Sequence, residues 1–198
     1  MNNKSLILIL VLFWAYDKKS IAQNIQFERI EYASFDVNSY RTKVKDTAFI
    51  DLYSVINKDG LLKVNNNDSY HNTHTYYTHR LTSAQLKSLD SIFNRKSLNI
   101  YLAKTKLEDN SFYAGSYDYF LVTYQNGSKD SLCIIAPFMS SDFEKVYDML
   151  DDIYYSDKNI KIKPFNISHD FIKSLMISYL NSNYLPKIQN PPAFRPEN

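Results

Sequence analysis

Two runs of apolar residues, joined through Asn126-Gly127, give the clearest structural signal in the chain. Both runs are rich in β-branched and aromatic residues, which are typical of strands. Asn-Gly between such runs is typical of a two-residue hairpin turn, because both residues accept positive φ. We therefore predict an antiparallel hairpin over residues 117–137.

A two-residue turn also fixes which side chains of this hairpin share a face. It places Phe120 opposite Cys133, on a face that we expect to be at most half buried. The other face is the predicted core face, and it consists of two opposed pairs: Tyr119 with Ile134 and Leu121 with Leu132.

Three later segments have apolar residues every three or four positions, which is typical of amphipathic helices. The segment 81–94 begins with a capping box of Thr82 and Gln85, and the segment 141–154 begins with a second one, Ser141 with Glu144. A third helix is expected to start at Ser168 and to stop before Pro186.

The remaining apolar stretches predict further strands at 26–35, 47–56, 61–64 and 73–80, a short strand at 98–102 and a short extended piece at 160–165. Residues 57–60 form a turn, and the polar residues 65–69 are expected to form a loop. Strands joined by hairpins and followed by helices predict an α+β fold. We expect a mainly antiparallel sheet of hairpins, with two or three amphipathic helices packed on one face. Residues 47–93 and 117–154 both run from hairpin to helix, which leaves an internal duplication open.

The N-terminus has the pattern of a signal peptide. Lys4 precedes a short apolar run, and Ser20 and Ala22 occupy the positions that a signal peptidase reads, so we expect cleavage after Ala22. The charged residues 17–19 keep an uncleaved, N-terminally membrane-anchored form open. The predicted organisation is a signal peptide over 1–22, one α+β domain over 23–186 in which helix 168–185 could be an appended element, and a flexible tail over 187–198. The protein is expected to be exported, periplasmic or secreted, with no membrane span after cleavage.

The charge, glycine content and cysteine content of the chain limit the classes of function that we expect. Removing residues 1–22 takes three lysines and one aspartate from 23 basic and 21 acidic residues, which leaves 20 of each. A neutral chain does not favour nucleic acid as a partner, and three glycines do not favour a phosphate-binding loop, so we expect no cofactor. The single cysteine, Cys133, rules out an intrachain disulfide and is expected to be buried and inert.

Three features together resemble the small exported α+β domains of unknown function in bacterial cell envelopes: the segment Ser20-Ile21-Ala22-Gln23, the turn Lys58-Asp59-Gly60, and the helix start at residues 81–86. The repeated hairpin and helix are also similar to the fold of β-lactamase-inhibitor-like proteins. Neither resemblance implies a catalytic residue.

Candidate catalytic and metal-binding groups are few. His71, His74 and His79 lie close together in the sequence, but no acidic residue or cysteine lies among them, and a strand would turn His74 and His79 to opposite faces. The sequence Ser168-His169-Asp170 is explained by a helix start, where serine caps and aspartate favours the dipole. We therefore expect neither a metal site nor a catalytic triad.

Aromatic residues beside polar ones are the remaining functional signal, because tyrosine offers contact area and a polar group at low entropic cost. The alternative is that these tyrosines belong to the core. The candidate binding surface consists of Tyr70, His71, His74, Tyr76, Tyr77, Tyr113 and Tyr117. On this basis we expect a non-catalytic binding module for a protein or an envelope polymer. A structural or assembly accessory of the cell envelope and a hydrolase with an unrecognised site are the alternatives.

Overall fold

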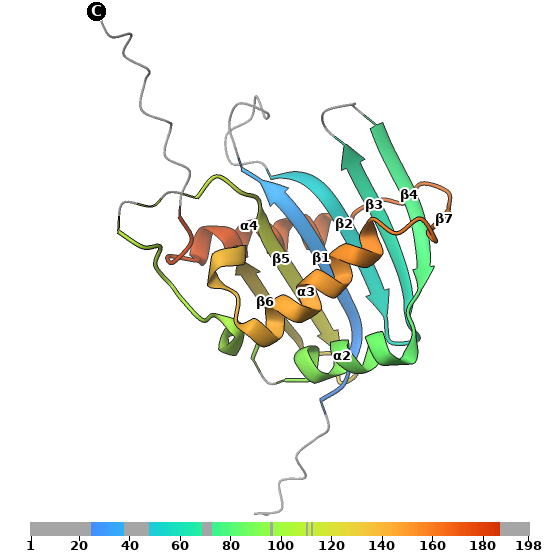
Figure 1. Cartoon of the computed structure of the whole chain (residues 1–198), viewed down its shortest axis with the longest axis horizontal. Helices are drawn as coiled ribbons and strands as arrows, with labels where there is room; N and C mark the ends of the chain where they lie inside the picture. The colour runs from blue at the N-terminus through green and yellow to red at the C-terminus, as the bar shows by residue number, and fades with distance from the viewer. Residues whose placement is uncertain are drawn as a thin grey trace, which may run out of the picture.

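The computed structural model describes residues 25–37, 48–68, 73–95, 97–109, 111 and 113–186, so the predicted signal peptide and tail lie outside the described residues. Within these ranges, seven strands form one sheet in the order β6-β5-β1-β2-β3-β4-β7 (Figure 1), and every pairing is antiparallel. The strands are β1 Phe27–Asp36, β2 Phe49–Asn57, β3 Leu61–Asp68, β4 Thr73–Arg80, β5 Tyr117–Tyr124, β6 Lys129–Ile134 and β7 Ile160–Lys161. The α+β class is confirmed.

The helices lie on both faces of the sheet, α2 and α3 on one and α4 on the other (Figure 1). Their bounds are α2 Ser83–Phe93, α3 Ser141–Tyr154 and α4 His169–Asn181, with short 3-10 turns η1 Leu98–Tyr101 and η2 Ala136–Phe138. The ring of Phe120 packs 5.1 Å from Phe143 of α3, whereas the neighbouring Tyr119 packs 5.4 Å from Phe171 of α4. Tyr119 and Phe120 are successive residues of a strand and point to opposite faces of the sheet, so α3 and α4 cover different faces. The expectation that the helices pack on one face is therefore wrong.

The predicted register of the central hairpin is wrong by one residue. In the structure Phe120 lies opposite Leu132 and Tyr119 lies opposite Cys133. The backbone N–H of Gly127 donates to Tyr124 O at 2.9 Å, and Gly127 has a positive φ of 81°. This is a three-residue loop with a bulge at glycine, which the sequence Asn-Gly also permits. Both faces of β5 are nevertheless buried, because each face has a helix to cover it.

The turn between β2 and β3 has the same geometry. Gly60 N–H donates to Asn57 O, and Gly60 has φ of 82°. A Cβ at Gly60 would lie 3.0 Å from Cδ1 of Leu86, so this turn also needs glycine to pack against α2. The duplication stays a hypothesis, because β4 lies between the first hairpin and α2 whereas η2 leads from the second hairpin to α3.

Two segments differ from the secondary structure expected of them. Residues 65–68 extend β3 instead of forming a loop, because the paired β4 continues alongside them to Thr73. Residues 98–101 form η1, and only Leu102 makes an isolated bridge, to Met139. The polar side chains of residues 65–68 obscured a strand that is stabilised mainly by its backbone ladder.

The helix starts were predicted in part. The capping box of Thr82 and Gln85 is present, and Ser168 accepts a hydrogen bond from Phe171 N–H, as expected. The second box is absent: α3 is capped at Ser140, whose hydroxyl is buried without a hydrogen-bond partner, and Ser141 is already helical. Among the helices of the described ranges, none combines the length and apolarity needed to cross a membrane.

Candidate ligand-binding site

The predicted aromatic surface is divided among separate places. Tyr70 and His71 lie outside the described residues. His74 and Tyr76 lie on β4, where their rings stack 6.3 Å apart, and Tyr76 also packs against Phe165. Tyr77 is buried, and its hydroxyl donates to Tyr154 O at the end of α3. Since Tyr76 and Tyr77 are adjacent on a strand, they face opposite sides of the sheet.

Tyr113 and Tyr117 lie away from β4, before and at the start of β5. Their rings are 6.2 Å apart, and the Tyr117 side chain is fully buried, with its hydroxyl 2.5 Å from Pro186 O. Burial raises the pKa of Tyr113 to about 12, helped by the nearby Asp118 carboxylate. Tyr77 and Tyr117 are therefore core residues, and the described part of the predicted surface that remains available on β4 is His74 with Tyr76.

The other groups considered from the sequence have structural partners. Nδ1 of His79 lies 3.0 Å from Oδ1 of Asn159, and Ser168 caps α4. Cys133 is buried, with 1 % of its surface exposed. In the ranges that the structure describes, no three His, Cys, Asp or Glu side chains gather as metal ligands would.

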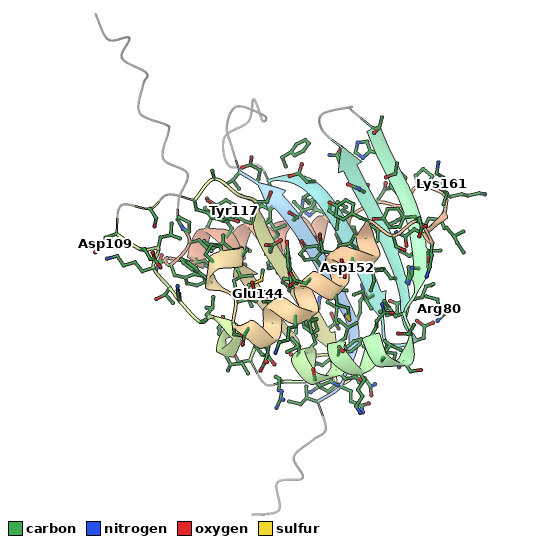
Figure 2. The ribbon with its side chains drawn as sticks, viewed as in Figure 1. Arg80, Asp109, Tyr117, Glu144, Asp152 and Lys161 are labelled. Atoms are coloured by element: carbon green, nitrogen blue, oxygen red, sulfur yellow. The ribbon has the colours of Figure 1, made fainter. Side chains whose placement is uncertain are left out.

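The outer side of α3 is acidic. Glu144 and Asp152 lie on this side of the helix, and Asp148 and Asp151 are also exposed (Figure 2). Partial burial raises the pKa of Asp151, and the charges of Asp152 and Asp148 raise it further. These carboxylates are solvated and do not line either of the pockets described below.

A buried polar cluster lies between the sheet and α3. The Asp118 carboxyl accepts hydrogen bonds from the hydroxyls of Tyr32, at 2.7 Å, and Tyr147, at 3.5 Å. Burial raises the pKa of Asp118 to about 7 despite these hydrogen bonds, and the charge of Asp151 adds to the effect. Asp118 is only 3 % exposed, so this carboxyl belongs to the core and is not presented to a ligand.

A second polar cluster lies on the opposite face of the sheet. Oε1 of Glu31 accepts hydrogen bonds from the Tyr53 hydroxyl at 2.6 Å and from Arg29 at 3.0 Å. This contact satisfies a carboxylate that is almost completely buried. The cluster holds strands β1 and β2 together beside α4.

A polar pocket of about 360 Å³ lies between the sheet edge at β6 and α4. We call it the β6–α4 pocket. The described residues that line it are Asn99, Ser131, Cys133, Ser174, Ile177, Ser178, Asn181, Ser182 and Tyr184.

The wall of this pocket comes from a polar stripe along α4. Ser174, Ser178 and Asn181 recur at intervals of four and three residues, which places them on one side of the helix. Phe171, Leu175 and Tyr179 form the adjacent apolar stripe and are buried against the sheet. The hydroxyls of Ser174 and Tyr119 lie 2.7 Å apart and fix the helix to β5.

Three lining side chains have hydrogen-bonding groups that no described residue satisfies. Asn99 and Asn181 are exposed, and Ser178 is half-buried. By contrast, the Ser182 hydroxyl donates to Ser178 O at 2.7 Å, and the Tyr184 hydroxyl donates to Cys133 O at 2.6 Å. Hydrogen bonds therefore hold Ser182 and Tyr184 in place, whereas the amides of Asn99 and Asn181 and the hydroxyl of Ser178 are available to a ligand.

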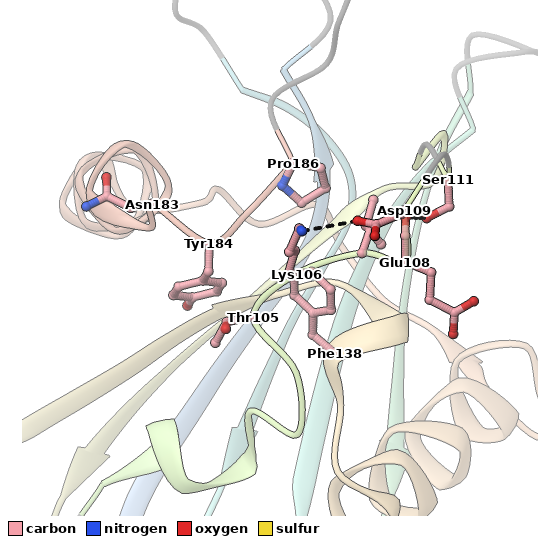
Figure 3. A pocket seen from close by; sticks show the side chains of 10 residues that line it. Thr105, Lys106, Glu108, Asp109, Ser111, Phe138, Asn183, Tyr184 and Pro186 are labelled. Atoms are coloured by element: carbon pink, nitrogen blue, oxygen red, sulfur yellow. Dashed lines mark hydrogen bonds and ion pairs between the residues drawn. The ribbon is translucent and has the colours of Figure 1, made fainter.

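A second pocket, of about 380 Å³, shares Tyr184 with the first (Figure 3). We call it the loop pocket. It contains an ion pair between Lys106 and Asp109 at 3.1 Å. Its described lining residues are Thr105, Lys106, Leu107, Glu108, Asp109, Ser111, Phe138, Asn183, Tyr184 and Pro186.

Comparison of the chain with protein-family models, with curated proteins and with solved structures gives no match. The function therefore has to be inferred from the geometry of the chain itself. The residues of the β6–α4 pocket were not predicted from the sequence, apart from Cys133 as an inert thiol. The signal that could have found them is the stripe of Ser174, Ser178 and Asn181 beside the apolar stripe of the last helix.

Proposed function

We propose that this protein is an exported, non-catalytic binding module whose ligand occupies the β6–α4 pocket. The observation that carries the proposal is the lining of this pocket. Seven of its nine described residues carry a hydroxyl or an amide, and the side chains of Asn99, Ser178 and Asn181 have no hydrogen-bond partner among the described residues. Convergent polar groups of this kind fix the orientation of a ligand in a binding site.

Binding is favoured over catalysis by the kind of groups in the lining. General acid–base chemistry needs a titratable side chain near the substrate, such as a carboxylate, an imidazole or an amine. The described lining of the β6–α4 pocket has none of these, and its thiol, Cys133, is 1 % exposed. A hydrolase would have to use other groups, and Asp118, whose pKa is raised to about 7, is buried beneath α3.

A role in protein assembly is the second candidate, and the edge of β4 favours it. On the outer edge of β4, the two-residue strand β7 pairs with Tyr77 and Thr78, and Ile162 N–H donates to Tyr76 O. The edge at His74, on the side away from β3, has no strand beside it among the described residues. An unpaired edge can accept an extended segment of another protein. The stacked rings of His74 and Tyr76 would then contact the added segment.

The two candidates are separated by mapping where a ligand binds. We would add the macromolecular fraction of the cell envelope to isotope-labelled protein that starts at Gln23, and follow its backbone amide signals. The proposal expects saturable changes at Asn99, Ser178 and Asn181. Changes confined to residues 73–76 would support the assembly role instead, and no saturable change at either place would contradict both.

A further inference from the structure

We propose that the β6–α4 pocket binds a neutral, hydroxyl-rich saccharide unit of a polymer. This inference rests on the proposed binding function and names the chemical class of its ligand. The β6–α4 pocket provides the hydrogen-bonding groups, the apolar contacts and the absence of charge in its described lining that such a unit requires.

The polar groups of the pocket match the hydroxyls of a sugar. Serine hydroxyls and asparagine amides each both donate and accept hydrogen bonds, as sugar hydroxyls do. Asn99 and Asn181 present two such amides from different elements, η1 and α4, to the same pocket. The described lining carries no Asp, Glu, Lys, Arg or His, so a charged ligand would lose its hydration there without gaining an opposite charge.

The same pocket provides apolar contact for the C–H groups of a sugar ring. Ile177 is 50 % exposed although it is a large aliphatic residue, and it lines the pocket one turn from Asn181. The ring of Tyr184 closes another side, and its orientation is fixed by the hydrogen bond to Cys133 O. A saccharide ring, with polar edges and less polar faces, would use both surfaces.

A ligand longer than one unit would extend from the β6–α4 pocket into the loop pocket. Because Tyr184 lines both pockets, a unit held in the β6–α4 pocket has the loop pocket as its neighbour. In the loop pocket, Lys106 is already paired with Asp109. The pocket volumes, about 360 and 380 Å³, lie at the lower end of the roughly 300–1,000 Å³ typical of small-molecule sites, as expected for one short segment of a chain in each.

An extended peptide fits this place less well than a saccharide. A peptide usually binds beside a sheet by pairing with the backbone of the edge strand. On β6, Cys133 O already accepts from the Tyr184 hydroxyl, and the Asp130 carboxylate accepts from Leu98 N–H at 2.7 Å. These contacts place Tyr184 and η1 where an added strand would lie.

The test uses defined probes and the protein that starts at Gln23. Maltotriose and the trisaccharide of N-acetylglucosamine are the neutral probes, a trisaccharide containing uronates is the anionic probe, and a six-residue peptide of small polar residues is the peptide probe. We expect saturable amide-signal changes at Asn99, Ser178 and Asn181 with at least one neutral probe, and weaker binding of the other two. Asn181→Ala should raise the Kd by about fivefold, the effect of losing about one net hydrogen bond.

Asn166→Ala is the matched control, because Asn166 is exposed and lies beside Phe165, which packs on Tyr53 and Tyr76 away from β6. Its Kd should be unchanged. Tighter binding of the anionic or peptide probe, or failure of both neutral probes, would overturn the saccharide inference. If the envelope fraction still changed the signals of Asn99, Ser178 and Asn181, the proposed function would stand and only the ligand class would be wrong. If the envelope fraction also left these signals unchanged, both the proposed function and the saccharide inference would be wrong.

Discussion

The hydroxyl of Tyr32 donates a 2.7 Å hydrogen bond to Oδ1 of Asp118 in the core between the sheet and α3. Asp118 lies on the same face of β5 as Phe120, and α3 covers it on that face. Among the described residues, its hydrogen-bond partners are the phenols of Tyr32 and Tyr147. Two neutral donors compensate a buried negative charge only in part, which is why burial keeps the pKa of Asp118 well above its ordinary value.

This carboxyl should make the stability of the protein depend on pH. The pKa of Asp118 is raised from 3.8 to about 7, so the folded state binds this proton more tightly than the unfolded state. Its contribution to stability is fully present below about pH 4 and is lost as the pH rises through about 7. The cost of the ionised form above pH 7 is about 4 kcal/mol. Asp118→Asn should remove this dependence and make the variant more stable than the wild type at pH 8.

Urea unfolding at several pH values between 5 and 8 measures the effect. The control is Glu144→Gln, which removes an exposed carboxylate from α3 and should leave the contrast between the wild type and Asp118→Asn unchanged. Parallel stability curves for the wild type and Asp118→Asn would show that the carboxyl does not titrate in this range.

Cys133 should react slowly with a thiol reagent in the native protein. Its side chain is 1 % exposed although it lines the β6–α4 pocket, so labelling requires local opening of β6 or α4. We expect a native rate at least about a hundredfold below the rate in denaturant. Cys133→Ser provides the blank. Similar rates in the two conditions would mean that the pocket exposes the sulfur atom.

The mature protein should begin at Gln23. The short apolar run and the small residues Ser20 and Ala22 motivate this expectation, and residues 1–22 lie outside the described residues. N-terminal sequencing of protein recovered from outside the cytoplasm is the measurement. Recovery of a chain beginning at Met1 would favour the membrane-anchored alternative.

Local signals in the sequence predicted elements better than they predicted the relations between them. The capping box at Thr82, the start of α4 after Ser168 and strand β4 are all present. The register of β5 and β6 was wrong because Asn-Gly fits both a two-residue turn and the three-residue loop observed at Gly127. Similarly, an apolar stripe shows that a helix is buried but not which face of the sheet it covers.

The candidate site was harder to predict because its residues are separated in the sequence and ordinary in type. Asn99, Ser131 and Asn181 come from η1, β6 and α4, and only the fold brings them together. The tyrosines that drew attention in the sequence are divided between surface and core. Tyr76 and Tyr77 illustrate the reason, since the period of a strand sends adjacent side chains to opposite faces.

The final prediction concerns the packing of the central hairpin. Leu132 is 1 % exposed and lies opposite Phe120, so Leu132→Ala should lower the free energy of unfolding by roughly 2–5 kcal/mol. Lys129 is exposed near the turn, and Lys129→Ala should change it by no more than about 0.5 kcal/mol. Denaturant melts of the two variants measure the contrast, and equal losses would contradict this arrangement.

Double-mutant cycles then test the register itself. Phe120 is the direct partner of Leu132, whereas Leu121 points to the α4 side of the sheet opposite Ser131. Leu132→Ala combined with Phe120→Leu should show a coupling energy of about 0.5–1 kcal/mol or more, because these side chains pack against each other. Combined with Leu121→Ala, the same change should be additive within about 0.5 kcal/mol. Coupling to Leu121 rather than Phe120 would restore the two-residue turn and would move Leu132 to the face of the sheet that carries α4.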